Sequence, residues 1–218
     1  MTATDDLDLR REIIATCLRM NGLGINQGSS GNVSVRAGDG LLITPSSLPY
    51  DETEPEDIVR LRFDGTWDGR RRPSSEWRFH RDILAARPDV GVVLHTHSTH
   101  ATVLACHGRG IPAFHYMVAV AGGSSIRCAP YATFGTQDLS DNAIRALEGR
   151  RACLLSNHGL IVLGDGLKQA LALAVEVETL ARQYVLALTL GQPAILSEPE
   201  MERVLDQFRR MKYGQSPN

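Results

Sequence analysis

The sequence has little net charge, no paired cysteines and no long apolar run, and each absence excludes a class of protein. Its 218 residues carry 23 basic and 25 acidic side chains, so a broad basic surface for nucleic acid is not expected. The longest apolar stretch, 167–190, contains four charged residues, too many for a membrane span of about 20 apolar residues. The cysteines form no Cys-x-x-Cys pair and give no sign of an oxidising compartment: Cys17, Cys106, Cys128 and Cys153.

The chain also lacks any segment that would divide it or direct it elsewhere. Its beginning, MTATDDLDLRRE, is acidic and has no apolar core of the kind a signal peptide needs, so we expect a cytoplasmic protein. No repeat, low-complexity tract or Pro/Gly/Ser-rich linker interrupts it, so we expect residues 1–218 to form a single domain. A chain of this length buries enough apolar surface to fold without a metal or a disulfide. A metal site in it would therefore serve function.

The hydrophobic patterns predict a mixed sheet covered by helices. Apolar residues at helical spacing, together with stop signals such as Gly22 and Pro88, predict helices over 8–21, 74–87, 98–106 and 167–190. Alternating or short apolar runs predict strands over 32–36, 41–44, 58–63, 91–94, 153–155 and 160–163. The first three strands follow one another across short turns, which favours antiparallel pairing.

Two histidines, His95 and His97, come directly after the strand predicted at 91–94. Side chains two residues apart in a strand point to the same face, so these two imidazoles form a chelating pair. Catalytic zinc commonly takes three protein ligands and keeps one position open. Candidates for the remaining ligands are His158, at another strand end, and Glu76, at the start of a helix. Spacing alone leaves three rivals open: His80, His100 and His107.

Three loops rich in small residues, 28–32, 44–47 and 73–75, form a second set of candidates. Serine hydroxyls and the N–H groups of tight turns and helix starts are what a phosphate monoester needs. Each loop by itself is typical of an ordinary turn. Because the third loop adjoins Glu76, the three together predict a phosphate pocket beside the metal.

Six stretches of the sequence resemble the class II aldolase/adducin family, in the family's order and with nearly its spacing. They are QGSSGNVSVR, LLITPSSLPY, PSSEWRFHRDIL, VVLHTHSTHATVLA, IPAFHYMVAVAGGSSIRCAPYATFGT and LLSNHGLIVLG. The resemblance implies an α/β fold of three αβα layers around a central, largely antiparallel sheet. It also implies a homotetramer with active sites at the subunit interfaces.

The resemblance further implies which residues form the site. It assigns Zn²⁺, or another divalent ion such as Mn²⁺ or Co²⁺, to Glu76, His95, His97 and His158. It assigns substrate phosphate to Ser29, Asn32, Ser46, Ser47, Ser74 and Ser75. Ser47 departs from the family, whose phosphate loop reads TP(S/T)G with glycine there. A side chain at this position either crowds the phosphate or offers it one more hydroxyl.

The activity implied is reversible cleavage of a ketose 1-phosphate, such as L-fuculose 1-phosphate or a deoxypentulose phosphate. The products are dihydroxyacetone phosphate and an aldehyde, formed through an ene-diolate. Glu76 acts as the base, and Tyr116, contributed by a neighbouring subunit, acts as the acid. Phe134 and Tyr213 are expected in the substrate pocket. The two lysines, Lys168 and Lys212, lie outside the motifs, which argues against a Schiff-base mechanism.

Other members of the family supply the alternatives. They are a sugar-phosphate epimerase, a dehydratase, a decarboxylase, and the non-catalytic adducin scaffold. The surroundings of Tyr116 favour the aldolase over the other enzymes. A complete ligand set argues against a scaffold.

Overall fold

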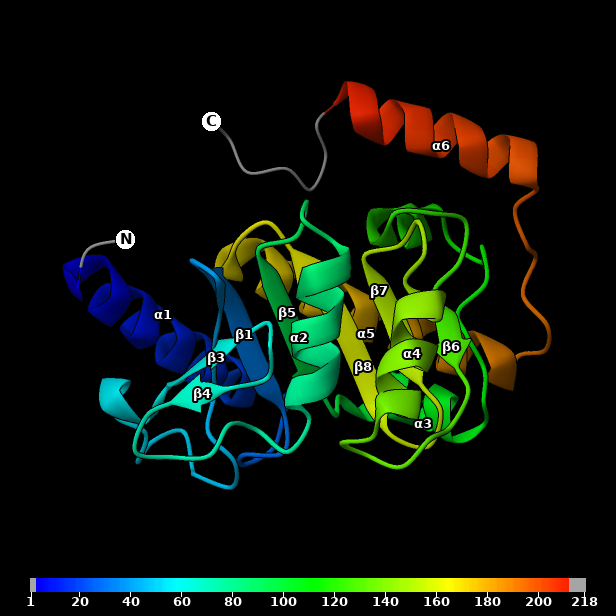
Figure 1. Cartoon of the computed structure of the whole chain (residues 1–218). Helices are drawn as coiled ribbons and strands as arrows, with labels where there is room; N and C mark the ends of the chain where they lie inside the picture. The colour runs from blue at the N-terminus through cyan, green and yellow to red at the C-terminus, as the bar shows by residue number, and fades with distance from the viewer. Residues whose placement is uncertain (1–2, 212–218) are drawn as a thin grey trace.

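The computed structural model describes residues 3–211, which form one sheet with helices on both faces (Figure 1). The strands are β1 (Asn32–Ala37), β2 (Gly40–Ile43), β3 (Val59–Arg62), β4 (Trp67–Asp68), β5 (Val92–Thr96), β6 (Arg127–Ala129), β7 (Ala152–Leu155) and β8 (Gly159–Gly164). The helices are α1 (Ala3–Gly22), α2 (Trp77–Ala86), α3 (Thr99–Cys106), α4 (Gln137–Ala146), α5 (Leu167–Thr189) and α6 (Glu198–Arg210). Two short 3₁₀ helices are η1 (Pro55–Asp57) and η2 (Tyr116–Ala121).

The described strands pair in the order β4-β3-β2-β1-β5-β8-β7-β6. Every neighbouring pair is antiparallel except β6 and β7, which are parallel. The expectation of a largely antiparallel sheet is therefore confirmed, as is the antiparallel pairing of the first three strands.

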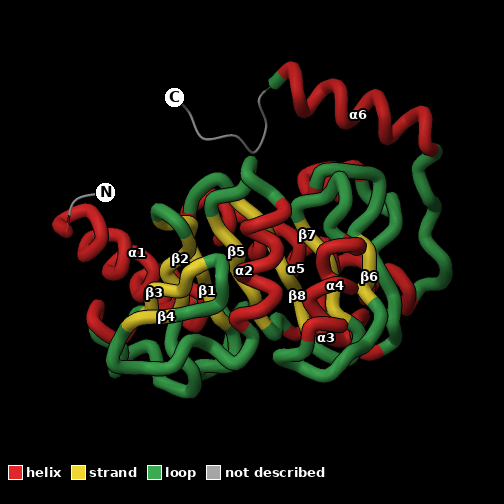
Figure 2. The backbone as a smooth tube through the Cα atoms, viewed as in Figure 1, coloured by secondary structure: helices red, strands yellow, loops and turns green. Residues whose placement is uncertain are grey.

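Side chains alternate between the two faces of the sheet, and each face has its own apolar core. In β5, Val92 and Leu94 join the core under α1, α3 and α5, whereas Val93 joins the core under α2 and α4. Figure 2 shows the helices on both sides of the strands. The three-layer αβα architecture is thus confirmed.

Most of the elements that the sequence patterns predict are present, with shifts at their ends. The first helix begins at Ala3 rather than at residue 8, and the helix expected from residue 74 begins at Trp77. The patterns missed β4 and β6, which have only two and three residues, as well as α4. Helix α6 lies at the edge of the molecule (Figure 1), and Met201 is its buried residue.

Two expectations about composition can be compared with the described residues. All four cysteines are free thiols, and Cys17 and Cys153 are buried. Within residues 3–211, no helix combines the length and the apolar character needed to cross a bilayer.

Candidate metal centre and phosphate pocket

Strand register brings the candidate ligands to one end of β5. Asn32, the first residue of β1, pairs with His95 near the end of β5. His158 lies in the turn between β7 and β8, and β8 is the other neighbour of β5. Glu76 immediately precedes α2. Segments that are far apart in the sequence therefore converge on one point.

The ligand atoms of Glu76, His95, His97 and His158 all lie within 4.8 Å of one another. The Nε2 atoms of His95 and His97 are 3.0 Å apart, as expected for side chains two residues apart in a strand. His158 Nε2 is 3.0 Å from Glu76 Oε1, and His95 Nε2 is 3.3 Å from Glu76 Oε2. Three histidines and one glutamate thus form a metal site.

A backbone contact orients the most deeply buried ligand. His95 Nδ1 lies 2.9 Å from the carbonyl oxygen of Leu160, and a carbonyl oxygen only accepts hydrogen bonds. The ring proton of neutral His95 therefore sits on Nδ1. Its Nε2 presents a lone pair to the cluster, which is the usual arrangement in metal-binding histidines.

The protonation states also suit a cation. Burial lowers the pKa of His95 to about 3, and burial together with His158 lowers the pKa of His97. Burial opposes ionisation of Glu76, but contacts with His95, His158 and Asn32 outweigh it and lower the pKa of the carboxyl group. Neutral imidazoles and an ionised carboxylate are the forms that bind a divalent metal.

One oxygen of the metal cluster is buried without a hydrogen bond. Glu76 Oε1 is inaccessible to solvent and accepts no hydrogen bond from the residues that the structure describes. A buried oxygen without a donor is costly, and a cation among the three Nε2 atoms would satisfy it. The donor set therefore fits a divalent metal.

The three rival histidines serve elsewhere. His80 is fully buried and contacts Ser34 and Asn32. His100 Nδ1 lies 2.7 Å from the carboxylate of Glu178, and His107 is exposed at the end of α3. None of them contributes an atom to the cluster.

A cavity of about 480 Å³ opens beside the cluster. Its lining includes all six residues that the resemblance assigns to phosphate: Ser29, Asn32, Ser46, Ser47, Ser74 and Ser75. Glu76, His97, His158 and Phe134 also line it. The amide of Asn32 has a specific partner, because its Nδ2 donates to Glu76 Oε2 at 2.9 Å.

Backbone hydrogen bonds join two of the serine loops, and a side-chain hydroxyl contacts the third. Ser46 N donates to the carbonyl of Arg72, and Ser74 N donates to the carbonyl of Thr44. The hydroxyl of Tyr50, a buried residue that the sequence analysis missed, donates to the carbonyl of Gly31. Ser47 has a φ of 57°, the left-handed conformation that favours glycine.

Tyr131 and Ala132 complete the aromatic side of the cavity and were also missed. Tyr131 and Phe134 are 62% and 64% exposed although both are large aromatic residues. The stretch between β6 and α4 carries them both, and its two exposed aromatic residues close together are the signal that could have identified Tyr131.

Of the two remaining predicted residues, Tyr116 does not line the cavity of its own chain. Tyr116 begins η2, is 50% exposed, stacks on His115 and lies near Phe208. It is absent from the cavity lining. Tyr213 lies outside the described residues.

A mixed sheet between two helical layers, with three histidines and one glutamate beside a serine-lined cavity, defines a metal-dependent enzyme of the class II aldolase type. The model of the class II aldolase and adducin N-terminal domain matches residues 11–185, and the chain belongs to this family.

Three proteins similar to this chain are aldolases of sugar phosphates. The chain is 59% identical to the 5-methylthioribulose-1-phosphate/5-deoxyribulose-1-phosphate aldolase of Rhodospirillum rubrum, covering 92% of this chain and 91% of that one. It is 49% identical to the L-fuculose phosphate aldolase of Escherichia coli, covering 92% and 94%. A solved L-fuculose 1-phosphate aldolase matches 93% of this chain and 96% of its own, with a TM-score of 0.90 and 40% identity.

Proposed function

We propose that this chain cleaves a ketose 1-phosphate reversibly, to dihydroxyacetone phosphate and an aldehyde, with Glu76 as the base. The protein is a class II ketose-1-phosphate aldolase, a metal-dependent aldehyde-lyase. The placement of Glu76 carries the residue-level proposal. Its carboxylate lies among three histidines and also lines the serine-rich cavity, so one group adjoins both the metal ligands and the substrate space.

We assign the metal as Zn²⁺, held by Glu76, His95, His97 and His158. Three imidazoles with one carboxylate are typical zinc donors. When bound, the cation supplies Lewis-acid stabilisation of negative charge on the substrate oxygens. The rest of the chemistry belongs to the side chains.

Glu76 is the group that moves the proton in this proposal. Its lowered pKa keeps it ionised at neutral pH, and Asn32 holds Oε2. Oε1 has no hydrogen bond that would hold it, so it would be free to leave a bound cation when substrate enters, and we assign it to the proton on the hydroxymethyl carbon in the synthetic direction. Glu76 is only 5% exposed, so little water reaches its carboxylate.

Hydroxyl and N–H groups hold the phosphate in this proposal. No lysine or arginine lines the cavity among the described residues, so the dianion is bound by hydrogen bonds from neutral donors. The donors are the side chains and backbone of Ser29, Ser46, Ser47, Ser74 and Ser75. The aromatic residues Tyr131 and Phe134 lie at the cavity as well and suit the apolar part of the aldehyde.

The acid in this proposal is Tyr116 of a neighbouring subunit in a homotetramer. Tyr116 is half-exposed and lies outside the cavity of its own chain, so it is available to another subunit. Mixing Glu76→Gln and Tyr116→Phe subunits tests this directly. Each variant alone should be nearly inactive, and mixed assemblies should regain part of the activity. Full inactivity of every mixture, with mixed assemblies demonstrated by mass, would contradict the shared site.

The first experiment measures cleavage of L-fuculose 1-phosphate, 5-deoxyribulose 1-phosphate and 5-methylthioribulose 1-phosphate, with dihydroxyacetone phosphate detected as product. Activity should disappear on chelation and return with Zn²⁺, and elemental analysis should find zinc at the purified site. The ratio of the three rates identifies the preferred aldehyde. Absence of product from all three substrates, with zinc bound, would overturn the proposal.

A further inference from the structure

A series of buried polar groups extends from the metal cluster into the protein. Ser34 Oγ lies 2.8 Å from His80 Nδ1, and His80 Nε2 lies 2.5 Å from Asn32 Oδ1. Asn32 Nδ2 lies 2.9 Å from Glu76 Oε2. Each of these four residues is at most 5% exposed. We call Ser34, His80, Asn32 and Glu76 the polar series.

The spacing of both elements builds this arrangement. Asn32 and Ser34 are two residues apart in β1, so their side chains share one face of the sheet. Glu76 and His80 are four residues apart at the start of α2, so they lie one turn from each other. Where α2 meets β1, the side chains from the two elements alternate: Ser34 and Asn32 come from β1, and His80 and Glu76 come from the start of α2.

Each hydrogen bond in the polar series has only one possible direction when Glu76 is ionised. A carboxylate only accepts, so the amide must turn Nδ2 toward Glu76. Asn32 Oδ1 then faces His80, and an amide oxygen only accepts, so His80 Nε2 must carry the proton. Because burial lowers the pKa of His80 to about 3, the ring is neutral and its Nδ1 accepts from the hydroxyl of Ser34.

We propose that His80, which lies against Ser34 and directs its Nε2–H at Asn32, is a positioning residue that locks the amide of Asn32 toward Glu76. This inference rests on the proposed function, in which Glu76 is the base. The lock leaves Oε2 hydrogen-bonded and Oε1 without a donor, so the carboxylate presents the same oxygen to the cluster at every turnover. Groups that orient a metal ligand in this way usually contribute strongly to activity.

A purely structural role explains less of the geometry. The ring of His80 stacks on Phe79 with centroids 4.6 Å apart, which an apolar side chain could do equally well. Both ring nitrogens, however, have polar partners in a site with no solvent access. His80 does not bind the metal itself, because it contributes no atom to the cluster.

The first test compares two substitutions at position 80. The side-chain N–H of glutamine can replace the Nε2–H donor toward Asn32, whereas leucine provides none. We expect His80→Leu to lower kcat about 10- to 100-fold with little change in KM, and His80→Gln to restore most of the loss. Thermal unfolding of both variants checks the fold. Equal kcat values for the glutamine and leucine variants would overturn the proposal.

The second test keeps His80 and removes one oxygen atom. In Ser34→Ala, Nδ1 loses its hydrogen-bond partner, so the ring is held less firmly, while Asn32 Oδ1 still favours the proton on Nε2. We expect ¹⁵N chemical shifts of the ring in the metal-free protein to show only the Nε2–H tautomer in the wild type. Ser34→Ala should keep this tautomer and have a lower kcat, because the ring of His80 is held less firmly.

Ser140→Ala is the matched control. Ser140 lies in α4 and is fully buried, and its hydroxyl donates to Asp82 in α2, outside the polar series. This substitution should leave the tautomer of His80 and kcat unchanged. A wild-type ring with its proton on Nδ1, or with protons on both nitrogens, would overturn the proposal. Because the tautomer is measured without metal or turnover, a failure of the aldolase assay would affect the proposed function and leave this measurement intact.

Discussion

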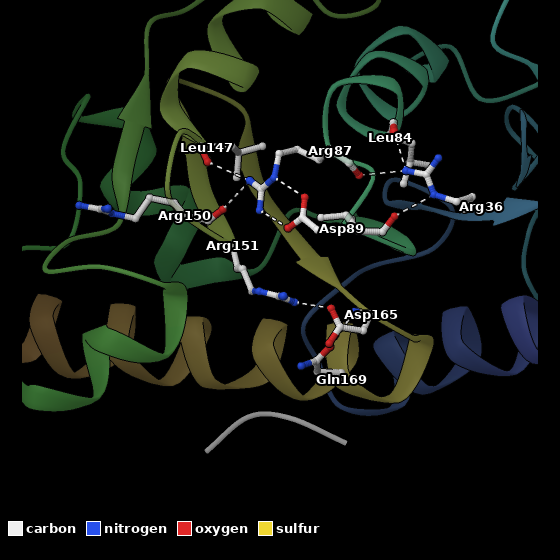
Figure 3. A network of polar contacts seen from close by, with 10 residues as sticks. Arg36, Leu84, Arg87, Asp89, Leu147, Arg150, Arg151, Asp165 and Gln169 are labelled. Carbon is white, nitrogen blue, oxygen red and sulfur yellow. Dashed lines mark hydrogen bonds and ion pairs between the residues drawn. The ribbon is translucent and has the colours of Figure 1, made fainter. Parts of the chain in front are cut away.

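The two ends of β5 show opposite ways of arranging polar groups. At the beginning of the strand, Arg36 and Arg87 donate to backbone carbonyls, Arg87 also pairs with Asp89, and Arg151 pairs with Asp165 (Figure 3). Each of these three guanidinium groups faces acceptor oxygens. At the far end, the possible ligand atoms of three histidines and one carboxylate face one another.

The difference separates a structural network from a functional site. Arg87 bonds to the carbonyls of Leu147 and Arg150 just after α4, and Arg36 bonds to that of Leu84 in the last turn of α2. Such contacts satisfy carbonyls that helix ends leave unpaired. Acceptors that face acceptors, by contrast, are retained in a fold only where a ligand resolves the conflict. The following four predictions test this contrast.

Replacing the base should have the largest effect. We expect Glu76→Gln to lower kcat about 10²- to 10⁴-fold, because the amide cannot accept the proton. The fold should persist, since the amide keeps the shape of the carboxylate. The control is Glu178→Gln, which weakens the buried carboxylate contacts at the start of α3 and should reduce thermal stability while leaving kcat intact. Turnover unchanged in Glu76→Gln would contradict its role.

Mild acid should destabilise the folded protein through the buried histidines near the metal cluster, at a pH that leaves the Arg87–Asp89 pair unaffected. The unfolded chain binds protons at His80 and His95 below pH 6.5, whereas the folded protein does so only near pH 3. Protonation therefore favours unfolding. As the pH decreases, the free energy of unfolding of the metal-free protein should fall by about 1.4 kcal/mol per pH unit for each histidine.

The window for this measurement lies between pH 6.5 and about 4.5. In that range Asp89 contributes no change, because Arg87 lowers its pKa and its stabilisation is lost only in stronger acid. Urea titrations at several pH values give the slope. His80→Gln should reduce the slope of the free energy of unfolding against pH by the contribution of one histidine. A slope of zero in the parent protein would contradict the lowered pKa values of the two histidines.

Breaking the arginine network should change stability alone. We expect Arg87→Ala to lower the free energy of unfolding by about 1–3 kcal/mol, because two carbonyls and Asp89 lose their donor. The kcat of the zinc-loaded protein and its zinc affinity should not change. Arg203→Ala, which removes an exposed pair on α6, should cost less than about 1 kcal/mol. A loss of zinc affinity in Arg87→Ala would show that the two ends are coupled.

The smallest effect should come from Ser47, which combines strain with exposure to the cavity. Glycine at this φ removes backbone strain but adds freedom to the unfolded chain, so Ser47→Gly should change stability by less than about 1 kcal/mol. Loss of the hydroxyl should raise KM about 2- to 10-fold, the equivalent of one neutral hydrogen bond. Inhibition by inorganic phosphate should weaken in parallel. An unchanged KM would exclude the hydroxyl from phosphate binding.

Local patterns in the sequence were sufficient for several parts of the protein. The two-residue spacing of His95 and His97 predicted a chelating pair, because strand geometry is periodic, and their Nε2 atoms are 3.0 Å apart. The β1–β2 hairpin and the long helix α5 also followed from short-range periodicity. Short elements such as β4 carry too few residues for a pattern to emerge.

Only the tertiary structure decided how these parts meet. The sequence alone left His80 and Glu76 as neighbouring candidates for one metal, and the folded protein separates their roles. Asn32 pairs with His95 across two strands, and α2 packs near them. This arrangement turns Glu76 into the cluster and turns His80 toward Asn32 and Ser34. Sequence periodicity determines which face a side chain shares, because it depends on local backbone geometry. The partners across that face depend on strand register and helix packing, which arise from contacts distant in sequence.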